Sequence, residues 1–261
     1  MILMYIITFV FGAIIGSFLN VCIHRLPRNL SIISPSSRCP SCQSPVRPYD
    51  NIPVLSYIIL KGRCRDCKTW ISPRYPLVES LNALMYIFTI WKFGLGWYTP
   101  FLFAFISSLI VITFIDLDFQ IIPDSITIPG VLIGLTAGSL VIPDPFARIH
   151  HVGFFNSIVG IISGGGLFYL IAIFGEKVFG QEAMGGGDIK LMAMIGGFLG
   201  WKSILLTTFA ASLTGSIAGI LLMIIKGRGK GLKVPFGPFI ALGAIISLFF
   251  GQEILRLYLG R

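Results

Sequence analysis

Charged residues are scarce in this chain of 261 residues. They make up 12% of it, against 55% hydrophobic residues, and only 11 positions are Asp or Glu. So little charge does not suit the surface of a water-soluble domain. Uncharged runs recur instead, and they are long enough to cross a hydrocarbon core of about 30 Å, which takes about 20 helical residues.

We therefore predict an all-α polytopic membrane protein with about eight transmembrane helices. The expected spans are 1–23, 77–91, 98–116, 125–143, 154–175, 183–200, 203–225 and 236–255. The first of them lacks the basic start and the Ala-x-Ala-like exit of a cleavable signal peptide, so we expect it to be a retained helix.

No helix-turn-helix or RNA-binding motif accompanies the net charge of +9, so nucleic acid is not an expected partner. With eight spans and the 24–76 loop inside, 15 Lys or Arg residues fall on the inner side and the other 5 outside. This asymmetry satisfies the positive-inside rule. It predicts that the 24–76 loop faces the cytoplasm and that the basic residues contact anionic lipid headgroups.

The 24–76 loop is the only long polar insertion, and it holds four of the five cysteines. They form two Cys-x2-Cys pairs separated by 21 residues: Cys39, Cys42, Cys64 and Cys67. Four thiolates in two such pairs can converge tetrahedrally on one Zn²⁺. The alternatives are two disulfides or four free thiols, but disulfides are rare in the reducing cytosol.

Zinc bound in this loop would be structural, because four thiolate ligands leave no open position for a substrate. A small, proline-rich loop has little core of its own, so the metal would supply much of its folding free energy. We predict a small zinc-ribbon-like domain here. Cys22, in the first span, is interpreted as a small buried apolar residue.

Two aspartates adjoin the long uncharged runs, where charge is expensive and indicates a functional site. Asp116 lies sixteen residues after Pro100, roughly 24 Å along a helix, and Asp188 lies thirteen before Trp201, roughly 20 Å. Both carboxyls are therefore expected at one level, beneath the cytoplasmic surface. Two carboxyls that meet cannot easily both ionise, and a shared proton suits a water-activating aspartic dyad.

The local sequence suggests different roles for the two acids. Asp116 ends a helix, near the negative end of its dipole, whereas Asp188 opens one, near the positive end, with Lys190 close by. We expect Asp188 to act as the base on water and Asp116 to hold the shared proton. Gly185 and Gly187 would admit an extended substrate backbone, although small residues can also serve helix packing.

Two further acids compete for the first position. Asp118, two residues from Asp116, would face almost the opposite way on a helix. Asp124 follows Pro123 at an expected helix start, where it would be a good cap or a residue supporting the site. A different class of function, a transporter or channel with acids as ion relays, would place them near the midplane and show an inverted repeat, which is not visible.

The motifs resemble those of the type IV prepilin leader peptidases along nearly the whole chain. The resemblance is carried by Gly16-Ser-Phe-Leu-Asn-Val-Cys-Ile-His-Arg-Leu-Pro27, the two cysteine pairs, Arg74-Tyr-Pro-Leu-Val-Glu79, Ile115-Asp-Leu-Asp-x4-Pro-Asp124, Gly185-x-Gly-Asp-x-Lys-Leu191 and Pro235-Phe-Gly-Pro238. It implies that Asp116 and Asp188 are catalytic and that the four cysteines bind zinc.

The resemblance further implies a bifunctional enzyme of the bacterial inner membrane. Such enzymes cleave the basic leader of prepilins and pseudopilins at the cytoplasmic face, then methylate the new N-terminal residue with S-adenosylmethionine. No Gly-x-Gly-x-x-Gly motif or other sign of a methyl-donor fold is present, so methyl transfer rests on the resemblance alone. A peptidase without methyl transfer is the rival interpretation.

Together these features predict three regions. They are a first transmembrane helix at 1–23, a cytoplasmic zinc-binding loop domain at 24–76 and a transmembrane aspartic peptidase domain at 77–261. The loop domain and Glu79 are the predicted place of the methyl-donor site.

Overall fold

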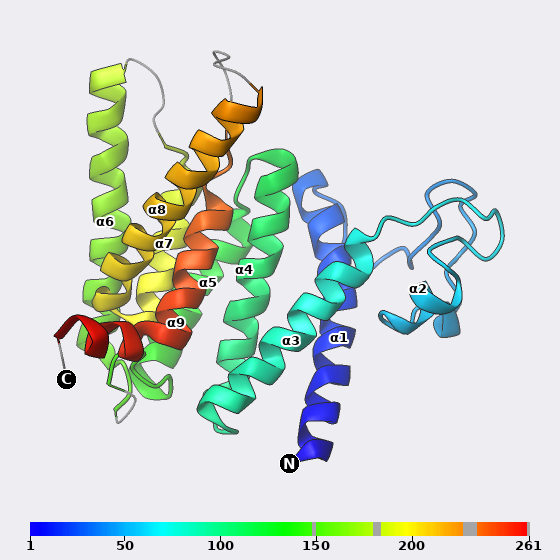
Figure 1. The fold of residues 1–261 in the computed structure, drawn as a ribbon, viewed down its shortest axis with the longest axis horizontal. Coiled ribbons are helices and arrows are strands. Elements are labelled where there is room, and N and C mark those ends of the chain that lie inside the picture. Colours follow the sequence, from blue (N-terminus) through cyan, green and yellow to red (C-terminus); the bar gives the residue numbers. More distant parts are fainter. Residues whose placement is uncertain (148–149, 180–183, 227–233, 260–261) are drawn as a thin grey trace. The chain divides into compact units, whose positions relative to one another are not determined.

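The computed structural model describes residues 1–147, 150–179, 184–226 and 234–259. Most of these residues are helical, and they contain no strand (Figure 1). The helices are α1 (Ile2–Arg25), α2 (Leu55–Ile59), α3 (Arg74–Phe93), α4 (Thr99–Phe119), α5 (Asp124–Leu140), α6 (Phe154–Phe179), α7 (Gly186–Leu199), α8 (Trp201–Lys226) and α9 (Gly237–Leu259).

Each of the eight predicted spans coincides with one of these helices, but the predicted number of membrane crossings is not confirmed. Within the described ranges, five helices are long and apolar enough to cross a membrane: Ile2–Arg28, Thr99–Phe119, Phe154–Val178, Trp201–Ile225 and Gly237–Tyr258. Helix α7 has 14 residues and reaches roughly 21 Å, short of a core of about 30 Å. The eight-span prediction counted apolar runs and took no account of this length.

The chain divides into two compact units. The first comprises Met1–Thr99 with Ile106–Val111, and the second comprises Pro100–Phe105 with Ile112–Arg261, so α4 contributes to both. The 24–76 loop belongs to the first unit. Asp116, Asp188 and Gly237 all belong to the second unit.

In the first unit, α1 and α3 pack closely as an antiparallel pair. Gly16 lies so near α3 that a Cβ there would be 2.6 Å from the Cα of Glu79. One turn earlier on α1, the Gly12 carbonyl accepts a hydrogen bond of 2.7 Å from the Asn82 amide. Small residues permit such close approach of helices in lipid, and a polar side chain can then bond across the interface.

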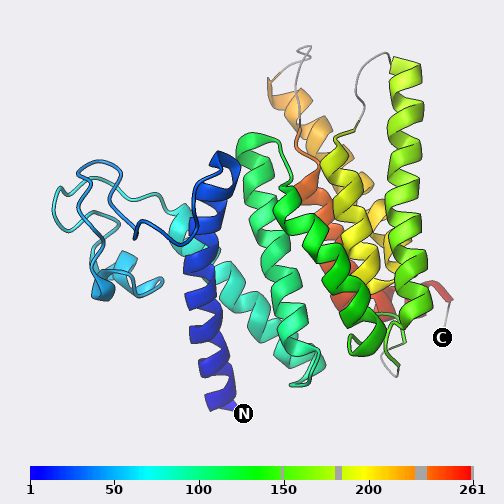
Figure 2. The ribbon, with the colours of Figure 1, turned by 180° about the vertical axis from the view of Figure 1, so that it is seen from behind.

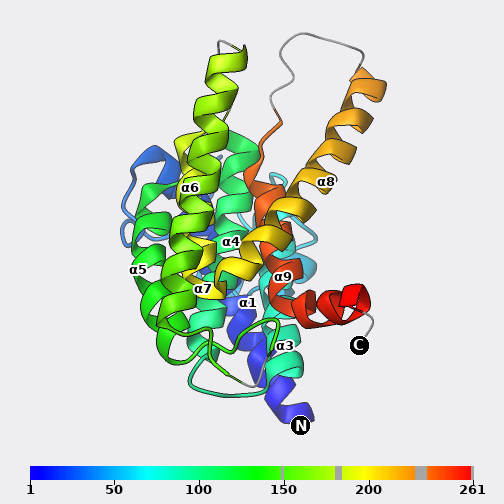
Figure 3. The ribbon, with the colours of Figure 1, turned by 90° about the vertical axis from the view of Figure 1, so that its left-hand side faces the viewer.

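In the second unit, α7 is the central helix. It packs against α5, α6 and α8, and eight of its 14 residues are buried. The ring of Phe198 on α7 stacks on that of Phe105 on α4, with centroids 4.6 Å apart. Helix α8 packs on α9, while α6 and α8 separate toward the end at which α7 begins (Figure 3). The short α7 is thus held by protein on several sides.

Candidate aspartate site and cysteine cluster

Asp116 lies in the last turn of α4 and is buried, with 5% of its surface exposed. Its Oδ2 atom accepts a hydrogen bond of 2.8 Å from the backbone N–H of Gly237, 121 positions further along the chain. Asp118 is exposed, as the sequence predicts for a residue on the other side of the helix. Of the acids near the end of α4, Asp116 is the one that faces inward.

Gly237 is a site residue that the sequence analysis missed. It is the first residue of α9, so its N–H belongs to the positive end of that helix dipole. A Cβ at this position would lie 2.7 Å from the Asp116 carboxylate, which explains a glycine here. The signal was present as Pro235-Phe-Gly-Pro238, a glycine between prolines at a helix start.

This contact removes the basis for assigning different roles to the two acids. The sequence shows only the helix that carries each aspartate, and Asp116 lies at the negative end of the dipole of its own helix. The structure places Asp116 against the positive end of α9 as well. Both acids therefore face a helix N-terminus, and helix dipoles do not distinguish the base from the proton holder.

Asp188 is the third residue of α7, in its first turn. Its backbone N–H bonds to the carbonyl of Gly185, the helix N-cap, at 3.1 Å. Its carboxylate is partly buried and feels the charge of Asp116. The end of α4 and the beginnings of α7 and α9 lie at the same end of this unit (Figures 1 and 2). The two predicted acids thus come from distant parts of the sequence into electrostatic reach of one another.

The glycines before Asp188 have different surroundings. A Cβ at Gly187 would lie 2.7 Å from the Cβ of Ile122, so this glycine allows the chain between α4 and α5 to pass close to α7. Gly185 and Gly186 are exposed, and among the described residues nothing lies within 4 Å of a Cβ built on Gly186. Packing therefore explains Gly187, whereas at Gly185 the one described atom within 4 Å of a Cβ is Oδ2 of Asp188, at 3.7 Å.

The prediction that Asp124 caps α5 is wrong. Pro123 is the N-cap and makes no side-chain capping bond, and Asp124 is the first helical residue. Both carboxylate oxygens of Asp124 lie 2.7 Å from the Nζ atom of Lys190. Lys190 was expected beside Asp188, but it forms its ion pair with Asp124. The ion pair joins the first turn of α5 to the first turn of α7.

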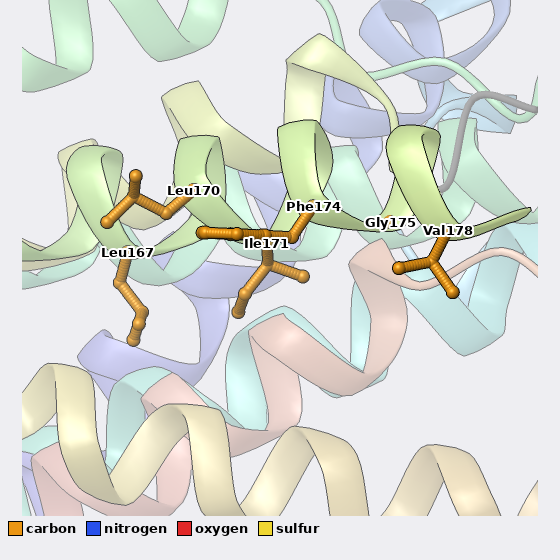
Figure 4. Close-up of a pocket in the computed structure, with 6 residues that line it drawn as sticks. All are labelled: Leu167, Leu170, Ile171, Phe174, Gly175 and Val178. Carbon is orange, nitrogen blue, oxygen red and sulfur yellow. The ribbon is translucent and has the colours of Figure 1, made fainter. Parts of the chain in front are cut away.

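An apolar groove runs along α6 in the second unit. It has a volume of about 480 Å³ and is lined by residues of α6 alone: Leu167, Leu170, Ile171, Phe174, Gly175 and Val178 (Figure 4). No ionisable or hydrogen-bonding side chain lines it. The groove therefore suits an acyl chain or an apolar helix and is not a candidate for the chemistry.

In the first unit, the four predicted cysteines converge. Their sulfur atoms all lie within 4.8 Å of one another, with 3.8 Å between Cys39 and Cys67 and 4.0 Å between Cys42 and Cys64. Four sulfurs around one Zn²⁺ at about 2.3 Å stand about 3.8 Å apart. The spacing fits a tetrahedral metal site and is far from the disulfide length of about 2.05 Å.

The two cysteine pairs are built alike, 25 residues apart. In the first, the N–H of Gln43 bonds to the Cys39 carbonyl at 2.9 Å, and in the second that of Lys68 bonds to the Cys64 carbonyl at 3.1 Å. Gln43 and Lys68 both have positive φ, 58° and 59°. Each pair is thus a tight turn that points two thiols the same way.

Two of these thiols, Cys67 and Cys42, lose their protons more readily than an ordinary thiol. Hydrogen bonding with the Thr69 hydroxyl and backbone lowers the pKa of Cys67 to about 6. Hydrogen bonding with Ser44 lowers the pKa of Cys42. Backbone N–H groups of Cys67 and Asp66 act to lower the pKa of Cys64, but burial and neighbouring thiols raise it to about 11. Four thiolates side by side need a cation, which a divalent metal supplies.

Glu79, predicted for a methyl-donor site, lies buried in the first turns of α3. Its Oε2 atom accepts a hydrogen bond of 2.7 Å from the backbone N–H of Val54. This bond fastens the residue that precedes α2 to the start of α3. It gives Glu79 a definite structural partner within the loop domain.

Comparison with known proteins identifies the family of the chain. Residues 10–93 match the Bacterial Peptidase A24 N-terminal domain, and residues 103–220 match the Type IV leader peptidase family. The chain belongs to the type IV leader peptidase family.

Relatives cover almost the whole chain. A prepilin leader peptidase/N-methyltransferase of Pseudomonas aeruginosa is 34% identical over 97% of this chain and 92% of its own length. One from Aeromonas salmonicida is 34% identical over 98% and 94%. One from Myxococcus xanthus is 40% identical over 84% of this chain and 63% of its own length. No solved structure matches the chain significantly.

Proposed function

We propose that this protein cleaves the basic leader from type IV prepilins and pseudopilins and then N-methylates the new N-terminal residue. Its family and its relatives, which carry the name prepilin leader peptidase/N-methyltransferase, support both activities. The same membership favours a peptidase over a transporter or channel.

The observation that supports the peptidase assignment is that Asp116 lies close enough to Asp188 for their charges to interact. In the proposed reaction one carboxylate takes a proton from water while the other, protonated, donates a hydrogen bond to the scissile carbonyl. The N–H of Gly237 holds the Asp116 carboxylate in place. No metal takes part in this step.

Substrate access is proposed beside Gly185 and Gly186. These two residues are exposed, and among the described residues no packing contact requires a glycine at either position. An extended substrate backbone could therefore lie against them, next to Asp188. The apolar helix that follows the leader of a prepilin would remain in lipid, with the cleavage site near the cytoplasmic surface.

S-adenosylmethionine is the proposed methyl donor, and it would supply an electrophilic methyl group to the freed amine. Its site is proposed in the loop domain near Glu79, whose carboxylate already binds the Val54 N–H. Zinc is the proposed ligand of Cys39, Cys42, Cys64 and Cys67, where it would stabilise the loop and take no part in catalysis.

We place the protein in the bacterial inner membrane as a multi-pass protein, with the cysteine loop and the aspartates at the cytoplasmic face. The distribution of basic residues supports this orientation. The proposed regions are the first helix at 1–23, the zinc-binding loop domain at 24–76 and the peptidase domain at 77–261, with prepilins and membrane lipid as partners.

The test uses the purified enzyme and one prepilin. Asp116→Asn and Asp188→Asn should each lower the cleavage rate by a factor of about 10²–10⁴, as expected for the loss of a catalytic acid or base. Methylation of an already cleaved substrate should continue, which shows that the variants are folded.

Asp118→Asn is the matched control, because this exposed acid lies two residues from Asp116. It should cleave at close to the wild-type rate. A loss in Asp118→Asn equal to that in Asp116→Asn would refute the assignment of the first acid.

A further inference from the structure

Helix α2 in the cysteine loop buries its serine and exposes its leucine and isoleucines. Its one polar residue with a small side chain, Ser56, is 7% exposed, whereas Ile58 and Ile59 are 65% and 64% exposed. The Ser56 hydroxyl donates a hydrogen bond to the Tyr49 carbonyl at 3.0 Å and accepts one from the Ile52 N–H at 3.1 Å. The helix therefore packs through its polar side onto the loop.

The outward side of this helix is apolar. Leu55, Ile58 and Ile59 are spaced three and four residues apart, so they share one face, and all three are exposed. We call these residues the α2 face. An outward apolar face of this kind needs an apolar environment to cover it.

A basic hollow is formed by residues that follow α2 along the loop. Lys61, Arg63, Lys68 and Trp70 line it together with Leu60 and Cys64, and its volume is about 370 Å³. Trp70 is 69% exposed, and the guanidinium of Arg63 lies over its ring, 5.2 Å from the centroid. Exposed Trp with long basic side chains is the composition typical of a membrane–water interface.

The net charge of the loop indicates which kind of membrane surface it would bind. Between 24 and 76 there are nine Lys or Arg residues and two acids, Asp50 and Asp66. Both acids pair with arginine, Asp50 with Arg65 at 2.6 Å and Asp66 with Arg47 at 3.7 Å. The net positive charge that remains complements a surface of anionic lipid headgroups.

The loop is also held close to the membrane. Its two ends continue into α1, which is long and apolar enough to span a bilayer, and α3. The bond from the Val54 N–H to Glu79 fixes the start of α2 beside the first turns of α3. Ile58 follows Val54 by four residues, roughly 6 Å along the helix. Figures 1 and 2 show α2 at the side of α1 within this unit.

We propose that the α2 face inserts into the interface of an anionic lipid leaflet and that the basic hollow binds the headgroups. The cysteine loop is then a domain that associates with the membrane surface, and its metal site is held there. This inference does not depend on the proposed enzymatic activity.

Trp70 itself reports on the contact. The chain has four tryptophans, at 70, 91, 97 and 201, so changing the other three to Phe leaves Trp70 as the sole emitter. The full-length protein is placed in nanodiscs that contain lipids brominated at shallow acyl positions. In anionic discs, Trp70 emission should shift to the blue relative to detergent and be quenched by the bromines.

The double variant Ile58→Asp/Ile59→Asp should lose the shift and the quenching while retaining bound metal, which shows that the loop is folded. Ile33→Asp is the control, because Ile33 is exposed in the same loop but lies outside α2; it should behave as the parent. Emission identical in detergent and discs, or equal quenching in zwitterionic discs, would overturn the proposal. A blue shift that appears only when a prepilin is added would also overturn it and identify a protein interface.

Discussion

The cysteine cluster and the aspartate site are assembled in opposite ways. The four cysteines come from two short turns of the same design, 25 residues apart, each closed by its own backbone hydrogen bond. The aspartates and Gly237 come from three helices, and the bond that holds Asp116 spans 121 positions. Local geometry therefore builds the first site, whereas helix packing builds the second. The two sites should respond to different perturbations.

The largest expected effect is the loss of metal from the cysteine cluster. Cys39→Ser or Cys64→Ser should abolish stoichiometric zinc, measured by elemental analysis of the purified protein, because three thiolates and a hydroxyl bind the metal far more weakly. Without metal, the 24–76 loop should become sensitive to trypsin while the helices of the second unit stay protected.

Cys22→Ser is the control for this experiment, because Cys22 is buried in α1 and lies outside the cluster. It should keep the zinc of the wild type. Full zinc content in Cys39→Ser would contradict a four-thiolate site.

A smaller, selective effect is expected at Gly237. In Gly237→Ala the new Cβ would stand 2.7 Å from the Asp116 carboxylate, so the carboxylate must move. A displacement of about 1 Å at a catalytic group can cost about 10²-fold in rate. Cleavage should fall by up to that factor, with zinc content unchanged.

Gly219→Ala provides the comparison, since no described atom lies within 4 Å of a Cβ on Gly219. This variant should cleave normally. Equal losses in the two variants would mean that the defect at Gly237 is a general one of helix stability.

The smallest effect is expected from the ion pair of Asp124 and Lys190. Both side chains are about half exposed, and pairs of this kind contribute about 1 kcal/mol or less. Asp124→Asn should therefore lower cleavage only a few-fold. The exchange Asp124→Lys/Lys190→Asp should recover much of the loss, whereas no recovery would indicate that Asp124 acts directly on the substrate.

The sequence predicted the features that local geometry builds and missed those that depend on helix packing. The helix ranges and the convergence of the cysteines depend on composition and spacing over a few tens of residues, and the structure contains both. The cap assigned to Asp124 was wrong because its partner, Lys190, is 66 positions away. The contact of Gly237 with Asp116 was missed for the same reason, although Pro235-Phe-Gly-Pro238 marked a helix start.

The predicted number of membrane spans is not confirmed, and helix packing is again the reason. The sequence of α7 is apolar from Leu191 onward, yet the whole helix, from Gly186 to Leu199, has only 14 residues. Hydropathy does not distinguish a helix covered by lipid from one covered by other helices. Here neighbouring helices bury most of α7, so its apolar residues do not by themselves identify it as a membrane crossing.

The central claim is that Asp116 and Asp188 act as one unit, and a double-variant cycle tests it most directly. Single-turnover cleavage of a prepilin is measured for the wild type, Asp116→Asn, Asp188→Asn and the combined variant. The account predicts that the combined variant loses no more activity than the worse of the two single variants, because each already disables the pair. Losses that multiply would show that the two acids act independently and would contradict the dyad.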